Sequence, residues 1–236
     1  MGEVRHVRSN SASEIYTALA DSAVCRASLS DNRYIVLSSK NTENNLLQID
    51  FNSGSYSTVP LVCFNTTGEV LFSSGNISNG VNPPNDFWMT DYGIFFDRVN
   101  SNGETSKYDN AGIVTLDSKD DTVCLFISGN AAVGTSGGTY SNVLHRLSIS
   151  NGVSGDTLKY DDGYQVNSIA TDYFNHLKTI NTTILCPFFT GGELNEPHYT
   201  PNAFFLPASQ TGRTEVHLVT INEAQYLTNG LWALKA

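Results

Sequence analysis

The chain has 236 residues, a formal net charge of −10 at neutral pH and 40% hydrophobic residues, with 12 Phe, 11 Tyr and 2 Trp. This many aromatic side chains can form a core, which excludes a disordered acidic tail. The acidic balance repels phosphate, so we expect no nucleic-acid partner. The length suits one large all-β domain, because single domains of that class often exceed about 200 residues.

Targeting signals and cysteines further narrow the class of protein. No apolar segment approaches the roughly 20 residues of a membrane-spanning helix, and the first residues lack the apolar centre of a secretory signal. We therefore expect no membrane insertion. The cysteines form no C-x-x-C pair and lie among apolar neighbours, which favours buried thiols over a zinc or redox site; three disulfide pairings stay open. They are Cys25, Cys63, Cys124 and Cys186.

Residues 1–22 differ from the remainder and are expected to form an N-terminal arm or short helix. Arg5, His6 and Arg8 make a small basic cluster in an acidic chain. Ser11–Glu14 has the spacing of a capping box before an apolar segment, which predicts a helix. We expect Arg5 and Arg8 to dock on an acidic neighbouring subunit. The alternative is a loosely ordered terminus.

Residues 23–236 have the pattern of an all-β domain. Short apolar or alternating segments recur about every 10–14 residues between turns rich in Gly, Asn and Asp. A segment of Gly, Asn, Ser and Pro at 73–86 is an expected subdomain boundary or binding loop. The expected strand segments are 27–29, 34–37, 46–51, 56–64, 69–72, 87–99, 112–116, 122–128, 142–149, 157–160, 172–189, 203–206, 215–221 and 230–234.

This rhythm, without alternation of strands and long helices, predicts an antiparallel β-sandwich or jelly roll. A small β-propeller is the alternative. Residues 28–59 and 86–127 each have the rhythm of a four-stranded blade, although they share no motif.

Motifs that carry chemistry are weak. The chain has no G-x-S-x-G motif, and its five histidines have no metal-ligand spacing. Glu193, Glu196 and His198 share one loop, and aspartates gather at 117–121 and 161–162, where turn formation is their usual role. We expect no catalytic residue, no metal ion and no cofactor.

Aromatic residues give the clearest surface prediction. Adjacent residues of a strand point to opposite faces, so one ring of each aromatic pair turns away from a single core. Such a ring often marks a subunit interface or a ligand platform. The alternative is that one thick domain buries both faces. The candidate binding residues are Trp88, Tyr92, Phe95, Tyr164 and Tyr173.

The Asn-, Ser-, Thr- and Gly-rich composition, the scarcity of Lys and the ending EVHLVTINEAQYLTNGLWALKA, with Asn229-Gly230-Leu231-Trp232, resemble the structural and host-recognition proteins of tailed bacteriophages. The resemblance is one of style over the whole chain. It implies an all-β virion protein assembled on a particle as a ring, trimer or decorating copy. It implies no catalytic residue.

The leading expectation is therefore a non-enzymatic virion protein of a tail, fibre, collar or capsid decoration. Its partners would be other virion proteins, further copies of itself and a host surface glycan, and it would assemble in the host cytoplasm. A carbohydrate-binding module that uses Trp88 is the second hypothesis. A polysaccharide-acting enzyme is the third, and it needs two carboxylates about 5–10 Å apart.

Overall fold

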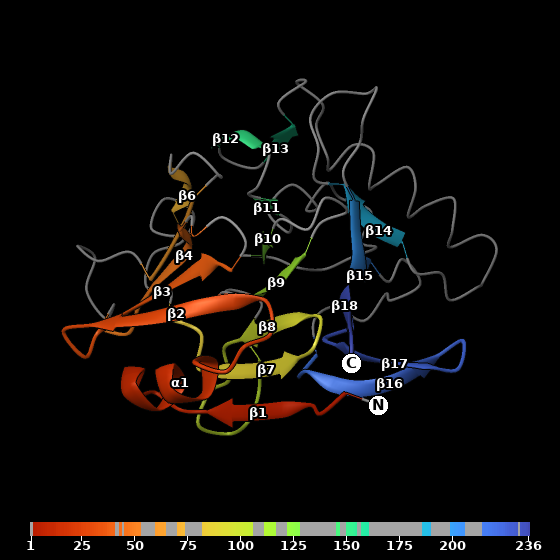
Figure 1. Cartoon of the computed structure of the whole chain (residues 1–236), viewed down its shortest axis with the longest axis horizontal. Helices are drawn as coiled ribbons and strands as arrows, with labels where there is room; N and C mark the ends of the chain where they lie inside the picture. Colours follow the sequence, from red (N-terminus) through yellow and green to blue (C-terminus); the bar gives the residue numbers. More distant parts are fainter. Residues whose placement is uncertain are drawn as a thin grey trace.

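The fold is all-β and antiparallel with one short helix, as the sequence predicts (Figure 1). The computed structural model describes residues 2–40, 43, 45–52, 60–64, 70–73, 82–105, 111–116, 122–127, 145–146, 150–154, 157–160, 186–189, 199–205, 214–230 and 232–236. Tyr164, Tyr173 and residues 74–81 of the expected loop lie outside these ranges.

Three larger sheets and one two-stranded ribbon contain the described strands. The N-terminal sheet has the order β2 (Cys25–Ser30), β3 (Tyr34–Ser39), β4 (Asn45–Asp50), β5 (Leu61–Phe64), β6 (Val70–Ser73). The central sheet has the order β1 (Arg5–Arg8), β7 (Asp86–Thr90), β8 (Gly93–Asp97), β9 (Ala111–Leu116), β10 (Thr122–Ile127), β11 (His145–Arg146). The C-terminal sheet has the order β14 (Cys186–Phe189), β15 (Tyr199–Phe205), β18 (Trp232–Lys235), β17 (Ala224–Thr228), β16 (His217–Ile221). The ribbon pairs β12 (Ser150–Ser154) with β13 (Thr157–Tyr160).

The expected helix is present as α1 (Ala12–Leu19). Ser11 is its N-cap, and the Ser11 hydroxyl accepts a hydrogen bond from the backbone N–H of Glu14. This is one half of the capping box that the sequence predicts, because the N-cap side chain satisfies an otherwise unpaired donor of the first turn. Ile15 and Leu19 on the inner face are fully buried.

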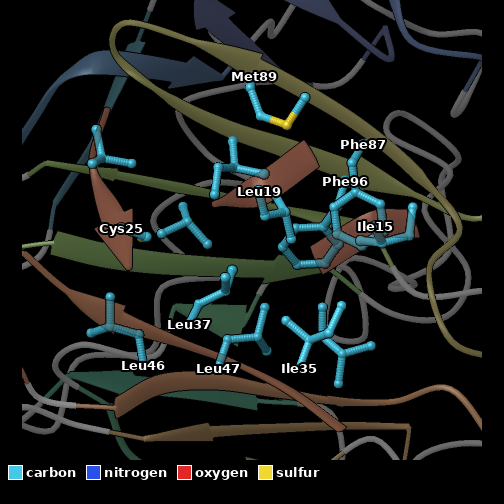
Figure 2. Packing of buried hydrophobic residues seen from close by; sticks show 14 of the residues in the cluster. Ile15, Leu19, Cys25, Ile35, Leu37, Leu46, Leu47, Phe87, Met89 and Phe96 are labelled. Carbon is cyan, nitrogen blue, oxygen red and sulfur yellow. The ribbon is translucent and has the colours of Figure 1, made fainter. Parts of the chain in front are cut away.

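The main core lies between the N-terminal sheet, α1 and one face of the central sheet. Ile15 and Leu19 lie near Phe87 and Phe96 of the central sheet, with leucine and isoleucine side chains of β3 and β4 beyond them (Figure 2). Cys25 belongs to the same buried cluster, as expected for a thiol that acts as a small apolar side chain. Two sheets with a shared apolar interior make this half of the molecule a sandwich.

The C-terminal sheet packs against the other face of the central sheet. A Cβ atom at Gly93 of β8 would overlap the carbonyl oxygen of Val114 and lie 3.0 Å from Cδ1 of Leu234 on β18. Glycine is therefore required at this position, where the Val114 carbonyl of β9 and the Leu234 side chain of β18 both approach β8. Because both faces of the central sheet are covered there, every residue of β8 is buried, including Phe95 and Phe96.

Three sequence interpretations of strands and turns were wrong. Segment 87–99 is not one strand, because the chain turns at Asp91–Tyr92 and forms the β7–β8 hairpin. A second turn at Asn222–Glu223, with φ of 49° and 68°, creates the unexpected strand β17. Asn151-Gly152, in the gap between the expected strands 142–149 and 157–160 where a turn was expected, lies within β12. Neither Asp-Tyr nor Asn-Glu is a strong hairpin signal, whereas Asn-Gly is one. Turn propensity therefore missed two hairpin turns and predicted one turn that is absent.

Residues 1–22, the expected N-terminal arm or short helix, pack with the rest of the chain. The N-terminal segment supplies β1, which is the edge strand of the central sheet, and α1, which enters the main core. Within the described ranges, the strands close neither a barrel nor a propeller. In that part of the chain, no helix is long and apolar enough to cross a membrane.

Candidate functional site

The pairing of β1 with β7 brings two groups of predicted residues together at the edge of the central sheet. His6 lies opposite Trp88, and Arg8 lies opposite Asp86. Opposed residues of an antiparallel pair project from the same face, and so do residues two apart in one strand. Side chains about 80 positions apart in the sequence therefore share one surface. We call His6, Arg8, Asp86, Trp88 and Glu215 the Asp86 cluster.

A buried carboxylate organises this cluster. The Asp86 side chain is 1% exposed, yet it binds three donors. Its Oδ1 atom lies 2.7 Å from Nε2 of His6 and 2.7 Å from Nε of Arg8. Its Oδ2 atom accepts a hydrogen bond of 3.1 Å from the indole N–H of Trp88. A carboxylate only accepts, so His6 presents Nε2 as the donor, and Asp86 is satisfied from three directions.

Trp88 is held on one side by His6. The imidazole and indole rings are stacked, with centroids 3.9 Å apart and an angle of 20° between their planes. The indole N–H bond to Asp86 fixes the ring within its own plane. Trp88 is thus half-buried and anchored, and His6 covers one of its two faces. On the other side of β7, Phe95 of β8 lies directly opposite Trp88.

Arg8 connects the central sheet to the segment before β16. Its guanidinium binds Asp86 through Nε and approaches Oε1 of Glu215 at 3.3 Å through the Nη2 atom. The hydrogen bond to Asp86, followed by the two nearby negative charges, raises the pKa of Arg8 above its ordinary value. Arg8 is therefore a positively charged residue that links β1 to Glu215, 207 positions further along the chain.

Both residues of the expected docking arm have acidic partners within the chain. Arg8 is bound within the chain, and Arg5 lies 3.8 Å from the carboxylate of Asp21 and donates a 2.8 Å hydrogen bond to the Asp21 backbone carbonyl. Docking of Arg5 and Arg8 on an acidic neighbouring subunit stays a prediction, and their side chains are 34% and 39% exposed. The sequence could not show the partners within the chain, because a cluster of charges does not reveal which residues it contacts.

Of the remaining predicted site residues, one is a cross-strand neighbour of Trp88: Phe95 lies directly opposite it in the β7–β8 hairpin. Tyr92 lies at the β7–β8 turn, where Nζ of Lys235 is 4.6 Å from its ring centroid. Phe95 is fully buried and so cannot form an exposed platform, because the C-terminal sheet covers its face of the central sheet. At β8 the structure thus agrees with the alternative expectation, that one thick domain buries both faces of an aromatic strand. Tyr164 and Tyr173 lie outside the described residues.

Sequence reasoning missed Asp86 and Glu215. Asp86 precedes a strong aromatic strand and looks like a strand boundary, and Glu215 is distant in sequence from every other member of the cluster. A buried carboxylate beneath a tryptophan has no linear signature. Only the β1–β7 register shows that Arg8 and Asp86 are partners.

The described contacts of the His6 ring lie within the Asp86 cluster. His6 uses Nε2 on Asp86, and among the described residues no hydroxyl or thiol is hydrogen-bonded to its ring. The same residues contain no group of three or more His, Cys, Asp or Glu that could hold a metal ion. Glu193, Glu196, His198 and the two aspartate-rich turns lie outside the described ranges, so the carboxylate pair of a polysaccharide-acting enzyme is not among the contacts described.

Comparison with known proteins adds no family to this geometry: no family model, no curated protein and no solved structure matches the chain.

Proposed function

We propose that the chain is a non-enzymatic structural protein of a virion, in a tail, fibre, collar or capsid decoration. The observation that carries the proposal is the use of the Asp86 cluster within the chain. Every polar group of Asp86 is occupied, and its partners join β1, β7 and the segment before β16. Contacts of this kind stabilise the fold and leave no polar atom of the Asp86 side chain for a substrate.

The style of the sequence supports the same proposal. An acidic, all-β chain rich in Asn, Ser, Thr and Gly resembles tailed-phage virion proteins, which act in assembly and in attachment to the host. The partners proposed are other virion proteins, further copies of the chain and a host surface glycan. Symmetric assemblies place the same surface on every copy, so one suitable contact suffices to build a ring or a closed oligomer.

Particle composition tests the proposal directly. Phage particles from the source culture are purified on a density gradient, and an antibody against the recombinant chain is applied to the fractions and to particles by immunogold electron microscopy. We expect the chain to co-sediment with intact particles and to label one defined part of them. A chain found only in the soluble fractions, with unlabelled particles, would reject the virion role.

Carbohydrate binding is the second candidate, and the exposed part of Trp88 favours it. The ring is anchored by Asp86 and backed by His6, so it could stack on a sugar without losing much side-chain freedom. The test is a glycan array followed by titration of Trp88→Ala. Tyr92→Ala is the matched control, because its half-buried ring lies apart from the cluster. Equal glycan binding by Trp88→Ala and the unmodified chain would reject this use of Trp88.

A further inference from the structure

Among the described strands, β16 lies at an edge of the C-terminal sheet, and its outer backbone groups can pair with a further strand. The N–H of Ala236 donates to the carbonyl of Gln225, which shows that Gln225 and Leu227 direct their backbone groups toward β18. Backbone direction alternates along a strand, so Ala224, Tyr226 and Thr228 face β16. Their partners there are Ile221, Val219 and His217. The N–H and C=O groups of Leu218 and Thr220 consequently point out of the sheet edge.

A row of leucines crosses the sheet toward this edge. Leu234 pairs with Leu227, and Leu227 pairs with Leu218, so the three side chains share one face of adjacent strands. Leu234 and Leu227 are fully buried, whereas Leu218 is 45% exposed. Leu218 is the one large apolar side chain that is exposed among the described residues. Leu218 is the last member of the row. An apolar side chain from a further strand beside β16 would cover it.

The other edges with described side chains are protected differently. The edge strand β1 contains Arg5, His6 and Arg8, and the edge strand β2 contains Arg26, which is paired with Glu43. Charged side chains on an edge strand discourage pairing with another chain. Strand β16, His-Leu-Val-Thr-Ile, has no Asp, Glu, Lys or Arg, and no proline. Of these three edges it is the one suited to accept a strand. Figure 1 shows β16 at the outer side of the β16–β17 hairpin.

We propose that β16 pairs antiparallel with β16 of a second copy, with Leu218 opposite Leu218 of that copy. The contact joins two C-terminal sheets into one continuous sheet and extends the leucine row across a two-fold axis. It deepens the proposed function, on which it rests for its place in a particle, but the contact itself is a property of the purified chain.

Charge selects this register over the neighbouring one. Three registers match the outward backbone groups: Leu218 opposite Leu218, Leu218 opposite Thr220, or Thr220 opposite Thr220, and the last places Leu218 opposite Asn222, so that the two leucines do not meet. The second places Glu215 opposite Glu223 of the other copy, and like charges directly opposed on a sheet are destabilising. The first places Glu215 opposite Ile221 and brings the two exposed leucines together. Both the apolar row and the charges therefore favour the Leu218-centred register.

Sedimentation equilibrium of the purified chain tests the contact. We expect a reversible dimer, with a dissociation constant between about 1 µM and 1 mM because a strand edge buries less area than a standard interface. Leu218→Lys should weaken dimerisation at least about tenfold, since it removes the apolar contact and opposes two cations. Gln225→Lys is the matched control: it adds the same charge to an exposed site on β17 and should leave the mass unchanged. Circular dichroism confirms that both variants fold.

A cysteine pair tests the register. In the Leu218-centred arrangement the two Leu218 Cα atoms form a hydrogen-bonded pair about 5.5 Å apart, which a disulfide can span. Leu218→Cys should therefore form a covalent dimer on mild oxidation, and Val219→Cys should not. Cross-linking of Val219→Cys alone would overturn the register. A monomer throughout the concentration range, or an unchanged dimer of Leu218→Lys, would overturn the contact, and in the first case a strand of another protein becomes the occupant to seek.

Discussion

Removal of the Asp86 carboxylate is the most informative perturbation of the fold and of the cluster. Asp86→Ala deletes the acceptor for His6, Arg8 and Trp88 at once. Breaking a buried ion pair by removing one partner costs about 3–5 kcal/mol. The side chains of His6 and Arg8 are 35% and 39% exposed, so water can solvate them after the change. This lowers the expected loss in free energy of unfolding to about 2–3 kcal/mol.

Urea unfolding measures this loss, and the surface supplies a matched control. Asp21→Ala removes a carboxylate from Arg5, also on β1, but the Asp21 side chain is 86% exposed and its ion pair is 3.8 Å long. An exposed pair of this kind contributes about 0.5 kcal/mol or less. For a chain of this size, the Asp86→Ala loss corresponds to a fall in Tm of about 4–12 °C.

Tryptophan fluorescence adds a local measurement. In a Trp232→Phe background the emission comes from Trp88, because the chain has 2 Trp. We expect Asp86→Ala to shift this emission to longer wavelength, since the indole loses its anchor and gains water. If Asp86→Ala costs no more free energy than Asp21→Ala and leaves the emission unchanged, then the cluster does not hold β1 on the central sheet.

Three further predictions concern the core and the helix. Ile15→Ala should lower the free energy of unfolding by about 2–5 kcal/mol in a urea titration, because Ile15 is fully buried; a loss below about 1 kcal/mol would mean that α1 is not part of the core. Gly93→Ala should lower Tm in calorimetry, because its Cβ would overlap the Val114 carbonyl oxygen, and an unchanged Tm would contradict the close approach of this β9 carbonyl to Gly93. Ser11→Ala should lower the free energy of unfolding by about 0.5–1 kcal/mol in the urea titration. Ser13→Ala, two residues further along and within α1, serves as its control, and equal effects of the two changes would contradict the assigned cap.

The alternating and turn-bounded segments were enough to predict the fold class. Tyr34–Ser39 alternates intermediate and buried side chains, and Asp31 and Asn32 adopt the positive φ of the tight turn before it. The helix was predictable because its cap and first turn are local in sequence. These features depend on neighbours within about four residues, so no tertiary information was needed.

The placement of the site was not predictable, because it depends on strand order. The sequence predicted Arg5 and Arg8 as a docking arm, and only the pairing of β1 with β7 shows that Arg8 binds Asp86. Phe95 looked like a surface ring, but packing of the C-terminal sheet on β8 buried it. The turn at Asn222–Glu223 has no strong turn signal in the sequence. It creates the β16–β17 hairpin, in which β16 is the outer strand.

The sequence by itself determined an acidic, all-β, antiparallel chain with a capped N-terminal helix, because alternation, turn residues and capping act over short stretches of chain. The tertiary structure alone decided which charges are neutralised, which aromatic rings are covered and which strand edge stays open. Those outcomes follow from pairings between residues up to 207 positions apart, and a linear pattern does not contain them.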